Sequence, residues 1–379
     1  MQFMEADRIL CDKLLPGLRG QLAEIPLAEL ESEDSPAIEM FRAHGGTNLL
    51  VPAGYGGLNA TALEAARVIR ALGALAPSMT VATMMHHFSL GTLFAVAETI
   101  GTESGLEDIL LRRIVADRML VASGFAEGHS GRGILDPTMR AEPVDGGFLI
   151  NGSKKPCSLS RSMDLLTASV SMPMPDGGRG TGVLMLPADT PGVSIHPFWS
   201  SFALAGAESN EVRLDDVLVT PEHIMQPNPE VVRQMDKLTT TGLIWFQMTV
   251  CASYTGIASA LVDKVLDRAR GSVSDRAALA VRIESAAALT EGLARRLMDG
   301  EVDNDTLATA LVTRFAVQDA LAATTSQAVE MLGGMAYIGS SDIAYLAAAT
   351  HAIGFHPPSR SSMAGGLVDY YAGYPVVVS

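Results

Sequence analysis

The sequence predicts an α+β protein with an N-terminal helical domain, a central antiparallel β-barrel or sandwich, and a C-terminal four-helix bundle. Two observations predict this order. Apolar residues recur at helical spacing towards both ends of the chain, whereas the middle holds short, partly β-branched segments separated by Gly, Pro or Asp. The 379 residues suffice for two or three closely joined domains. We expect the domains to span residues 1–118, 119–228 and 229–379.

The first region is predicted to be helical. Residues 62–76, "ALEAARVIRALGALA", place apolar side chains along one broad face at the spacing of an amphipathic helix. A loop rich in glycine precedes this segment, and Asn59 or Thr61 is suited to cap the helix that follows.

The middle region is predicted to be a sheet. Its segments include "GGFLINGSKK", "DLLTASVSM" and "GTGVLMLPA", and the pair Asp145-Gly146 is typical of a hairpin turn in which both residues adopt positive φ angles. No helical segment of 10 to 15 residues separates these strands, and no G-x-G-x-x-G loop follows one, so a parallel dinucleotide-binding sheet is disfavoured.

The last region is predicted to form a bundle. Helical patterns cover residues 248–269, 275–300, 305–334 and 342–355, and their alanine-rich faces allow close approach of neighbouring helices. Asp305 is suited to cap the third of these helices at its start, and Gly333-Gly334 to end it.

Composition excludes several classes of function. The formal charge of −15 opposes a nucleic-acid partner, which would need clustered Lys and Arg. No apolar run reaches the roughly 18 residues of a membrane span, and the first ten residues lack a leader pattern, so we expect no membrane partner and a cytoplasmic location. Cys11, Cys157 and Cys251 are scattered, which predicts neither disulfides nor a metal site.

Five motifs in order resemble the acyl-CoA dehydrogenase family of flavoproteins. They are "LLVPAGYGGLNATALE", "GFAEGHSGRG" (124–133), "GFLINGSKKPCSLS" (147–160), "SNEVRLDDVLVTPEHI" (209–224) and "AVEMLGGMAYI" (328–338). The resemblance covers almost the whole chain. It implies FAD between the β domain and the bundle, an acyl-CoA or acyl-carrier-protein substrate beside the flavin, a flavoprotein or O₂ as electron acceptor, and a homodimer or homotetramer.

The resemblance also implies which residues contact the flavin. Ala126, with Phe125 before it, stands where the family has a threonine or serine, so the backbone N–H is kept and the hydroxyl is lost. Arg132 stands where a serine touches the pyrophosphate; its guanidinium suits phosphate, and a solvated loop arginine is an equal alternative. Pro156 replaces a tryptophan that covers the flavin. Ser158 keeps a hydroxyl near flavin N5, or is a plain strand-end serine.

Three further positions are carried over from the family. Gly333 and Gly334 match a segment that reaches a neighbouring subunit's cofactor, and Arg360 falls where the family has a polar cofactor contact.

We read Cys157 as a small buried residue and not as a nucleophile, because no neighbouring histidine or basic cluster would lower its pKa.

The family's catalytic glutamate is absent. It lies in a Tyr-Glu-Gly-Thr sequence, and the matching residues here begin with Phe355 and His356. Another branch carries its glutamate at the position of Phe246. Three interpretations follow: His356 is the base; it only shapes the pocket while Glu127 or Glu208 acts; or no carbon-bound proton is removed.

The substrate pocket is expected to involve His87, Phe246 and Phe355. His87 belongs to "MMHHFSL", which resembles a helix that borders the acyl pocket in the family. Adjacent histidines point to different sides of a helix, so we expect one of His86 and His87 to be packed and one to lie near a cavity, and no metal site.

The leading hypothesis is therefore a flavin-dependent oxidoreductase that desaturates an acyl thioester in specialised biosynthesis. The first alternative is a flavin-dependent monooxygenase on the same scaffold, which uses reduced flavin and O₂ and needs a hydrogen-bond donor near the flavin; Ser158 and His356 suit that role. The second alternative is a non-redox protein that binds acyl thioesters. Neither alternative requires a carboxylate at position 356.

Overall fold

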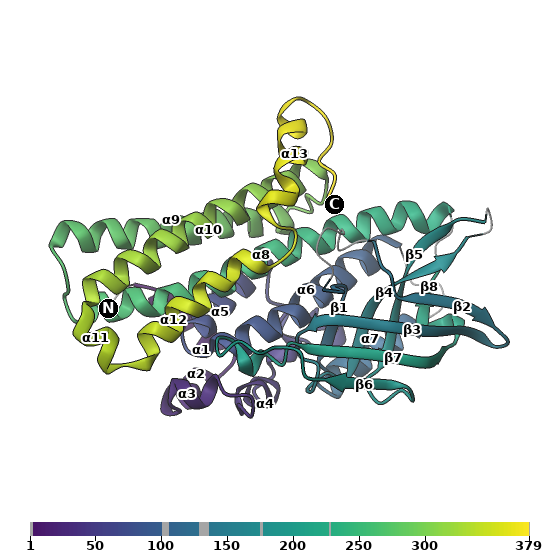
Figure 1. Cartoon of the computed structure of the whole chain (residues 1–379), viewed down its shortest axis with the longest axis horizontal. Helices are drawn as coiled ribbons and strands as arrows, with labels where there is room; N and C mark the ends of the chain where they lie inside the picture. The colour runs from purple at the N-terminus through teal and green to yellow at the C-terminus, as the bar shows by residue number, and fades with distance from the viewer. Residues whose placement is uncertain (1–2, 101–105, 129–135, 175–176, 227–228, 379) are drawn as a thin grey trace.

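A computed structural model describes residues 3–100, 106–128, 136–174, 177–226 and 229–378. Figure 1 shows an elongated molecule with the sheet at one end and the long helices at the other. The order of elements is helical, then β, then helical, as predicted. In the part of the chain described here, no helix is long and apolar enough to cross a membrane.

The N-terminal helices wrap one side of the core. They are α1 (Glu5–Leu14), α2 (Leu18–Glu24), α3 (Leu27–Leu30), α4 (Ala37–Ala43), α5 (Ala62–Gly73), α6 (Pro77–Ile100) and α7 (Leu106–Ala116), with short 3-10 turns η1 (Gly46–Asn48) and η2 (Ala53–Tyr55). Thr61 caps α5 in a capping box with Glu64, which confirms one of the two predicted caps. Helix α6 packs against both the sheet and the bundle.

The sheet is mostly antiparallel. Its strands are β1 (Val121–Gly124), β2 (Arg140–Val144), β3 (Gly147–Cys157), β4 (Leu165–Pro173), β5 (Arg179–Pro187), β6 (Val193–His196), β7 (Asn210–Val219) and β8 (Ile224–Met225). Their order is β6-β7-β3-β2-β4-β5-β8, and β1 pairs in parallel with β4. The β2–β3 hairpin forms as predicted, but only Gly146 of the expected pair has a positive φ, at 85°.

The C-terminal helices form the bundle. They are α8 (Pro229–Asp267), α9 (Val273–Met298), α10 (Asn304–Leu332), α11 (Gly334–Gly339) and α12 (Ser341–His351), followed by the 3-10 turn η5 (Ala352–Phe355) and α13 (Arg360–Tyr371). Helix α10 begins earlier than predicted, because Asp303 and not Asp305 accepts the hydrogen bond from Thr306 N, at 2.8 Å. Gly333 ends α10 with φ 82°, as predicted.

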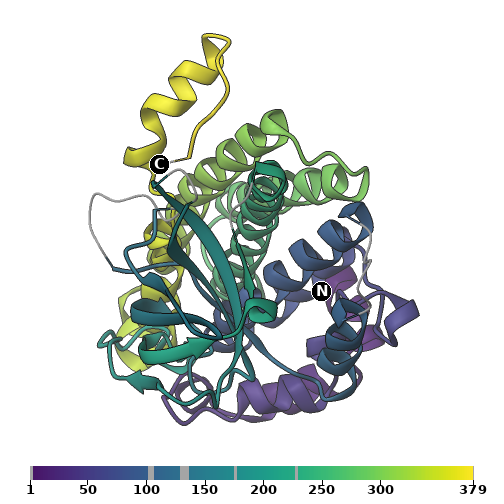
Figure 2. The ribbon, with the colours of Figure 1, turned by 90° about the vertical axis from the view of Figure 1, so that its right-hand side faces the viewer.

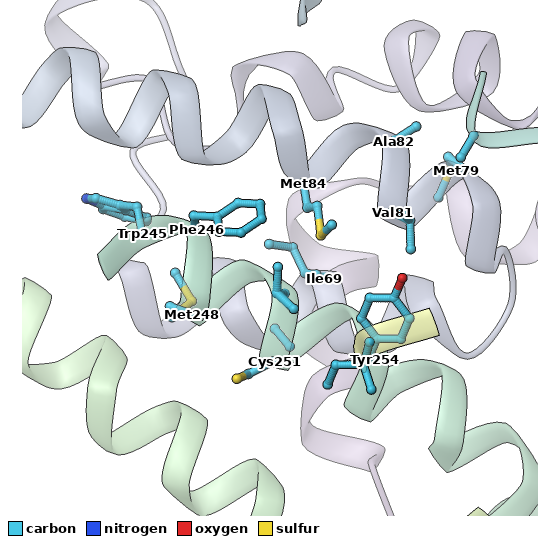
Figure 3. Packing of buried hydrophobic residues seen from close by; sticks show 14 of the residues in the cluster. Ile69, Met79, Val81, Ala82, Met84, Trp245, Phe246, Met248, Cys251 and Tyr254 are labelled. Atoms are coloured by element: carbon cyan, nitrogen blue, oxygen red, sulfur yellow. The ribbon is translucent and has the colours of Figure 1, made fainter. Parts of the chain in front are cut away.

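Helix α8 lies at the centre of the fold. It packs against α5, α6, α9, α10 and α12, and one buried hydrophobic cluster runs through all three regions of the chain. Figure 3 shows Phe246 of α8 beside Met84 of α6, with Cys251 and Tyr254 further along α8. The contact between α6 and α8 therefore connects the sheet side of the molecule with the bundle.

Candidate functional site

Two serines meet at one end of the sheet. Strand β3 ends at Cys157, strand β7 begins at Asn210, and these two residues are paired across the antiparallel ladder. Ser158 and Ser209 therefore leave the sheet side by side, and their hydroxyl oxygens lie 2.9 Å apart. Both serines are buried. One of the two hydroxyls donates its hydrogen to the oxygen of the other. The hydrogen of the accepting hydroxyl is then free to donate to a ligand.

The loop after β1 lies against the same strand end. Lys155 N donates to the Ala126 carbonyl at 2.9 Å, which holds the loop on β3 beside Pro156. Phe125 and Ala126 are half-buried, and Pro156 is exposed. The Ala126 N–H donates to no acceptor within the described ranges. The structure thus brings together four of the residues predicted to contact the flavin; Arg132 lies outside the described residues.

Glu127 is committed to a buried ion pair behind this loop. Its carboxylate accepts from Lys154 Nζ at 2.6 Å, and also from the Thr138 hydroxyl and backbone. Burial alone would raise the pKa of Glu127, but the Lys154 ammonium and the Thr138 hydrogen bonds lower it to about 2. Glu208 is also occupied, since it accepts from Ser162 N and Oγ at 2.8 and 2.7 Å. Neither glutamate is placed as a free base.

His356 lies just after the turn η5, where Pro357 and Pro358 interrupt the helical path. Its ring is half-buried between two aromatic side chains of α8: the Phe246 ring centroid is 6.0 Å away, and the Tyr254 centroid 5.3 Å. Phe246 also packs edge-on against Phe88 of α6, at 5.3 Å. The predicted residues His356 and Phe246 therefore lie in one aromatic cluster, which we call the His356 cluster.

Tyr254 determines which nitrogen of His356 carries the proton. The Tyr254 hydroxyl lies 2.7 Å from His356 Nε2 and makes no second hydrogen bond with a described residue. Tyr254 is fully buried, and burial raises the pKa of its phenol, so the hydroxyl keeps its hydrogen and must donate it to Nε2. His356 then carries its own hydrogen on Nδ1, and Nδ1–H is a donor.

His356 stays neutral over the physiological range. Burial disfavours the imidazolium, and the positive charge of Arg314 adds to this effect; together they lower the pKa of His356 to about 3. A neutral Nδ1–H tautomer has no acceptor lone pair on Nδ1. The arrangement can donate a hydrogen bond at Nδ1, but it cannot accept a proton there.

The two histidines of α6 are both buried, and the expectation that one of them lies near a cavity stays a prediction. His86 Nε2 lies 2.8 Å from the Thr47 carbonyl, and His86 Nδ1 accepts from Val121 N at 3.1 Å, which fixes α6 to β1. His87 packs edge-on against Phe41, and neither ring nitrogen has a hydrogen-bond partner in the described structure. Burial lowers the pKa of His87 well below its usual value.

Three predicted residues or pairs lie apart from the His356 cluster. Phe355 is 82% exposed. Gly333 and Gly334 lie at the junction of α10 and α11, and Arg360 donates to the Phe315 carbonyl at 3.0 Å and to Asp319 at 2.7 Å. In a single chain, none of them contacts His356 or Ser158 through a hydrogen bond or ring contact among the residues described.

A cleft of about 190 Å³ lies elsewhere, between α3 and α12. Its lining includes Leu27, Glu31, Phe202 and Tyr345, and none of the predicted site residues. Glu31 is already satisfied, because it accepts from Ser78 N and Oγ and from the Tyr345 hydroxyl. This cleft is a junction between α3 and α12, and we assign no chemistry to it.

The residues at the strand end fit a flavin ring. The ring edge of a flavin consists of carbonyl oxygens and nitrogens that accept hydrogen bonds, and the strand end offers matching donors: a free hydroxyl hydrogen from the pair Ser158 and Ser209, and the Ala126 N–H. These donors are half-buried or buried, where a hydrogen bond to a ligand is worth most.

Sequence reasoning missed Ser209, Tyr254 and Arg314. Tyr254 and Arg314 are polar residues on the buried faces of α8 and α10, in the apolar runs "CASYTGIASALV" and "ATALVTRFAV". A polar side chain within such a run is a signal that could have been read. The pairing of Ser209 with Ser158 had no local signal.

Comparisons with known proteins agree with the fold. Residues 122–217 match the family "Acyl-CoA dehydrogenase, middle domain". The chain is 49% identical over 378 residues to isobutylamine N-hydroxylase of Streptomyces viridifaciens, covering 100% of both chains.

Solved structures share the fold over nearly the whole chain. FMN-bound TdsC from Paenibacillus sp. A11-2 has a TM-score of 0.83 at 16% identity, covering 99% of both chains. The nitrososynthase from Micromonospora carbonacea var. africana has a TM-score of 0.82 at 21% identity, covering 97% of this chain and 96% of that one. The protein is thus a flavin-dependent oxidoreductase, and its chain belongs to the acyl-CoA dehydrogenase family of flavoproteins.

Proposed function

We propose that the protein hydroxylates the nitrogen of a small aliphatic primary amine with reduced flavin and O₂. In this reaction one oxygen atom of O₂ enters the N–O bond, the other leaves as water, and reduced flavin supplies two electrons. The full-length likeness to an isobutylamine N-hydroxylase supports the substrate class. This is the monooxygenase alternative of the sequence analysis, and it replaces desaturation as the leading hypothesis.

The observation that carries the proposal is the hydrogen bond between Tyr254 and His356. Desaturation of an acyl thioester needs a base that accepts the α-proton of the substrate. The Nδ1–H tautomer of His356 offers a donor instead. A donor suits a reaction in which an oxygen atom must take up a proton as it leaves as water.

The surroundings of His356 also favour an amine over an acyl thioester. No carboxylate forms a hydrogen bond or ion pair with His356 or Tyr254 within the described ranges. The walls contributed by Phe88 and Phe246 are apolar, which suits a short alkyl chain. An amine nitrogen attacks oxygen through its lone pair, so this reaction needs no carbon acid and no carboxylate base.

Ser158, Ser209 and the Ala126 N–H are the residues that would hold the flavin. Bound reduced flavin would activate O₂ and supply the oxygen atom and the electrons. The chain would orient the ring at the strand end and place the His356 donor on the bundle side of the substrate. The experiment below compares FMN with the FAD expected from sequence.

Desaturation remains the second candidate, because family membership and the sequence motifs favour it. The experiment supplies the purified protein with FMN or FAD, a flavin reductase and NAD(P)H, under air and with ¹⁸O₂. The substrates are isobutylamine, other short amines and a panel of acyl-CoA and acyl-carrier thioesters. Product masses are determined by mass spectrometry. We expect a hydroxylamine that contains one ¹⁸O atom.

Two outcomes would overturn the proposal. Anaerobic bleaching of bound flavin by a thioester, with loss of two hydrogens, would establish desaturation. A protein that binds thioester and no flavin would support the non-redox alternative.

Two substitutions of one residue test the role of His356. The amide nitrogen of Asn reaches about as far as Nδ1, whereas that of Gln reaches about as far as Nε2. We expect His356→Gln to lose about 10²-fold of N-hydroxylation, as for a lost hydrogen-bond donor to the reacting oxygen, and His356→Asn to retain most of it. Equal loss in both variants would contradict a donor at Nδ1.

A further inference from the structure

Arg314 of α10 is a buried cation without a carboxylate partner. Its relative exposure is 1%, and it forms no ion pair with an Asp or Glu in the described part of the chain. The protein treats other buried cations differently: Arg70 pairs with Asp7 and Glu291, and Lys154 pairs with Glu127. An unpaired buried charge is costly, so its position calls for a physical reason.

The partners of Arg314 are neutral oxygen atoms. Its Nη2 donates to the Ile353 carbonyl, and its Nη1 donates to Gln318 Oε1 at 3.1 Å, while Nε has no partner. Ile353 lies in η5, at the carboxyl end of α12. The last carbonyls of a helix carry partial negative charge, which a guanidinium neutralises in part.

The same carbonyl starts the turn that carries His356. The His356 N–H donates to the Ile353 carbonyl at 3.4 Å, so Arg314 and the backbone of His356 share one acceptor. On the other side of the turn, Gln247 Nε2 of α8 donates to the Pro357 carbonyl at 3.4 Å. Gly354 lets Gln318 pack under the turn, because a Cβ there would lie 3.3 Å from Gln318 Nε2. Arg314 thus anchors the turn from the side of α10.

The charge of Arg314 also acts on the titratable groups around it. Tyr254 and Cys251 face it from α8, Arg360 from α13, and His356 from the turn. None of these groups is a carboxylate. Burial lowers the pKa of His356, and the Arg314 guanidinium lowers it further. The same Coulombic repulsion would disfavour an ammonium group bound beside His356.

We propose that Arg314 is a positioning residue: it anchors the turn that carries His356, and its uncompensated positive charge keeps both His356 and a bound amine uncharged. The site then takes its amine as the free base, the form whose lone pair attacks oxygen. The part of this proposal that concerns the amine rests on the proposed N-hydroxylation. The part that concerns His356 does not.

The first test measures binding without turnover, in oxidised protein loaded with flavin. Isobutylamine and its uncharged isostere isobutanol are titrated by calorimetry between pH 6.5 and 8.5. Since alkylammonium groups titrate near 10.4, as in Lys, a site for the free base should bind isobutylamine about tenfold more tightly for each pH unit, while isobutanol binding stays constant. In Arg314→Met the amine slope should flatten, because the ammonium form is no longer repelled.

The second test follows His356 itself. NMR of ¹⁵N-histidine-labelled protein should show a neutral Nδ1–H ring throughout the pH range in the parent and in Arg314→Lys, which keeps the charge. In Arg314→Met or Arg314→Gln the ring should titrate closer to the usual histidine range and exchange between tautomers. Two variants without the charge are used so that misfolding of one does not decide the result.

The outcomes separate the two proposals. An unchanged His356 titration in both uncharged variants would overturn the role of Arg314, and so would an equal amine slope in the parent and in Arg314→Met. If the parent binds neither isobutylamine nor isobutanol, the proposed function fails on this substrate class, while the His356 titration still decides the positioning role.

Discussion

The β-sheet and the helical bundle each bury a cation close to the predicted site, and the protein neutralises them differently. In the sheet, Lys154 is 0% exposed and faces Glu127, whose side chain is 8% exposed, at 2.6 Å. In the bundle, Arg314 is equally buried but faces only the Ile353 carbonyl and the amide of Gln318. The first arrangement is a closed ion pair, whereas the second leaves net positive charge behind His356.

The two arrangements differ in how far each positive charge acts on its surroundings. In the closed pair, the Glu127 carboxylate offsets the charge of Lys154, and the contact holds the loop after β1 against β3. An open charge acts on whatever lies beside it. Burial is the larger cause of the neutral state of His356, and the charge of Arg314 adds to it. Perturbed ionisation of this kind is typical of functional sites.

The largest expected effect comes from opening the closed pair. Glu127→Gln leaves the Lys154 ammonium buried without a counter-ion, and we expect a loss of about 3–5 kcal/mol in the free energy of unfolding, measured by urea denaturation. The matched control is Glu142→Gln, because Glu142 forms an exposed pair with Arg179 at 3.3 Å. That change should cost under about 1 kcal/mol. Equal losses would mean that burial does not decide the energetics.

The pH dependence of stability is the next effect. A histidine whose folded pKa is near 3 cannot take up the proton that the unfolded chain takes up near 6.5, so His356 destabilises the fold progressively as the pH falls below 6.5. Between pH 7 and pH 5 this contributes about 1–2 kcal/mol. We expect His356→Asn to lose that much less stability than the parent over this interval, as measured by denaturation at each pH. Parallel curves would exclude a neutral His356.

Glu127 stabilises the fold, in contrast to His356, and its contribution changes over a lower pH range. Its folded pKa of about 2 lies below the ordinary value of 4.5, so its contribution is complete above pH 4.5 and is lost as the pH falls towards 2. The two residues therefore separate on the pH axis. Glu127→Gln should remove the pH dependence of stability only below about pH 4.5. A change in that dependence near pH 6 would contradict the low pKa assigned to Glu127.

A smaller effect is expected when the donor to His356 is removed. Tyr254→Phe keeps the ring and deletes the 2.7 Å hydrogen bond, so we expect a loss of about 1 kcal/mol in stability. The more specific readout is the ¹⁵N shift of His356, which should report a mixture of tautomers in place of one. A single Nδ1–H tautomer in the variant would show that Tyr254 does not set it.

The smallest effect on stability is expected at α13. Figure 2 shows this helix standing off the rest of the molecule, and it exposes Val368 (69%) and Tyr371 (73%). We expect these residues to contact another copy of the chain, so Val368→Asp should shift the protein towards monomer in sedimentation experiments while leaving unfolding of the monomer unchanged. Val281→Asp, at an exposed valine of α9, is the control. The same shift in both variants would show that α13 is not an interface.

Local patterns predicted much of the fold. Thr61 begins one helix and Gly333 ends another as predicted, because caps depend on a few neighbouring backbone groups. The cap of α10 was placed two residues too late, since Asp303 and Asp305 fit the same local pattern. His356 and Phe246 were selected by resemblance, and their rings do lie in contact.

Sequence by itself thus determined the order of helical and β regions, the caps, and the candidate residues Ser158 and His356. Tertiary structure alone decided what those residues can do. Ser209 meets Ser158 only after a register shift between Lys154 and Cys157, which depends on the pairing of β3 with β7. Tyr254 and Arg314 reach the turn of His356 from two other helices, and no local pattern encodes such a contact. A histidine becomes a donor or a base through its neighbours in space, because hydrogen bonding and burial set its tautomer and its charge.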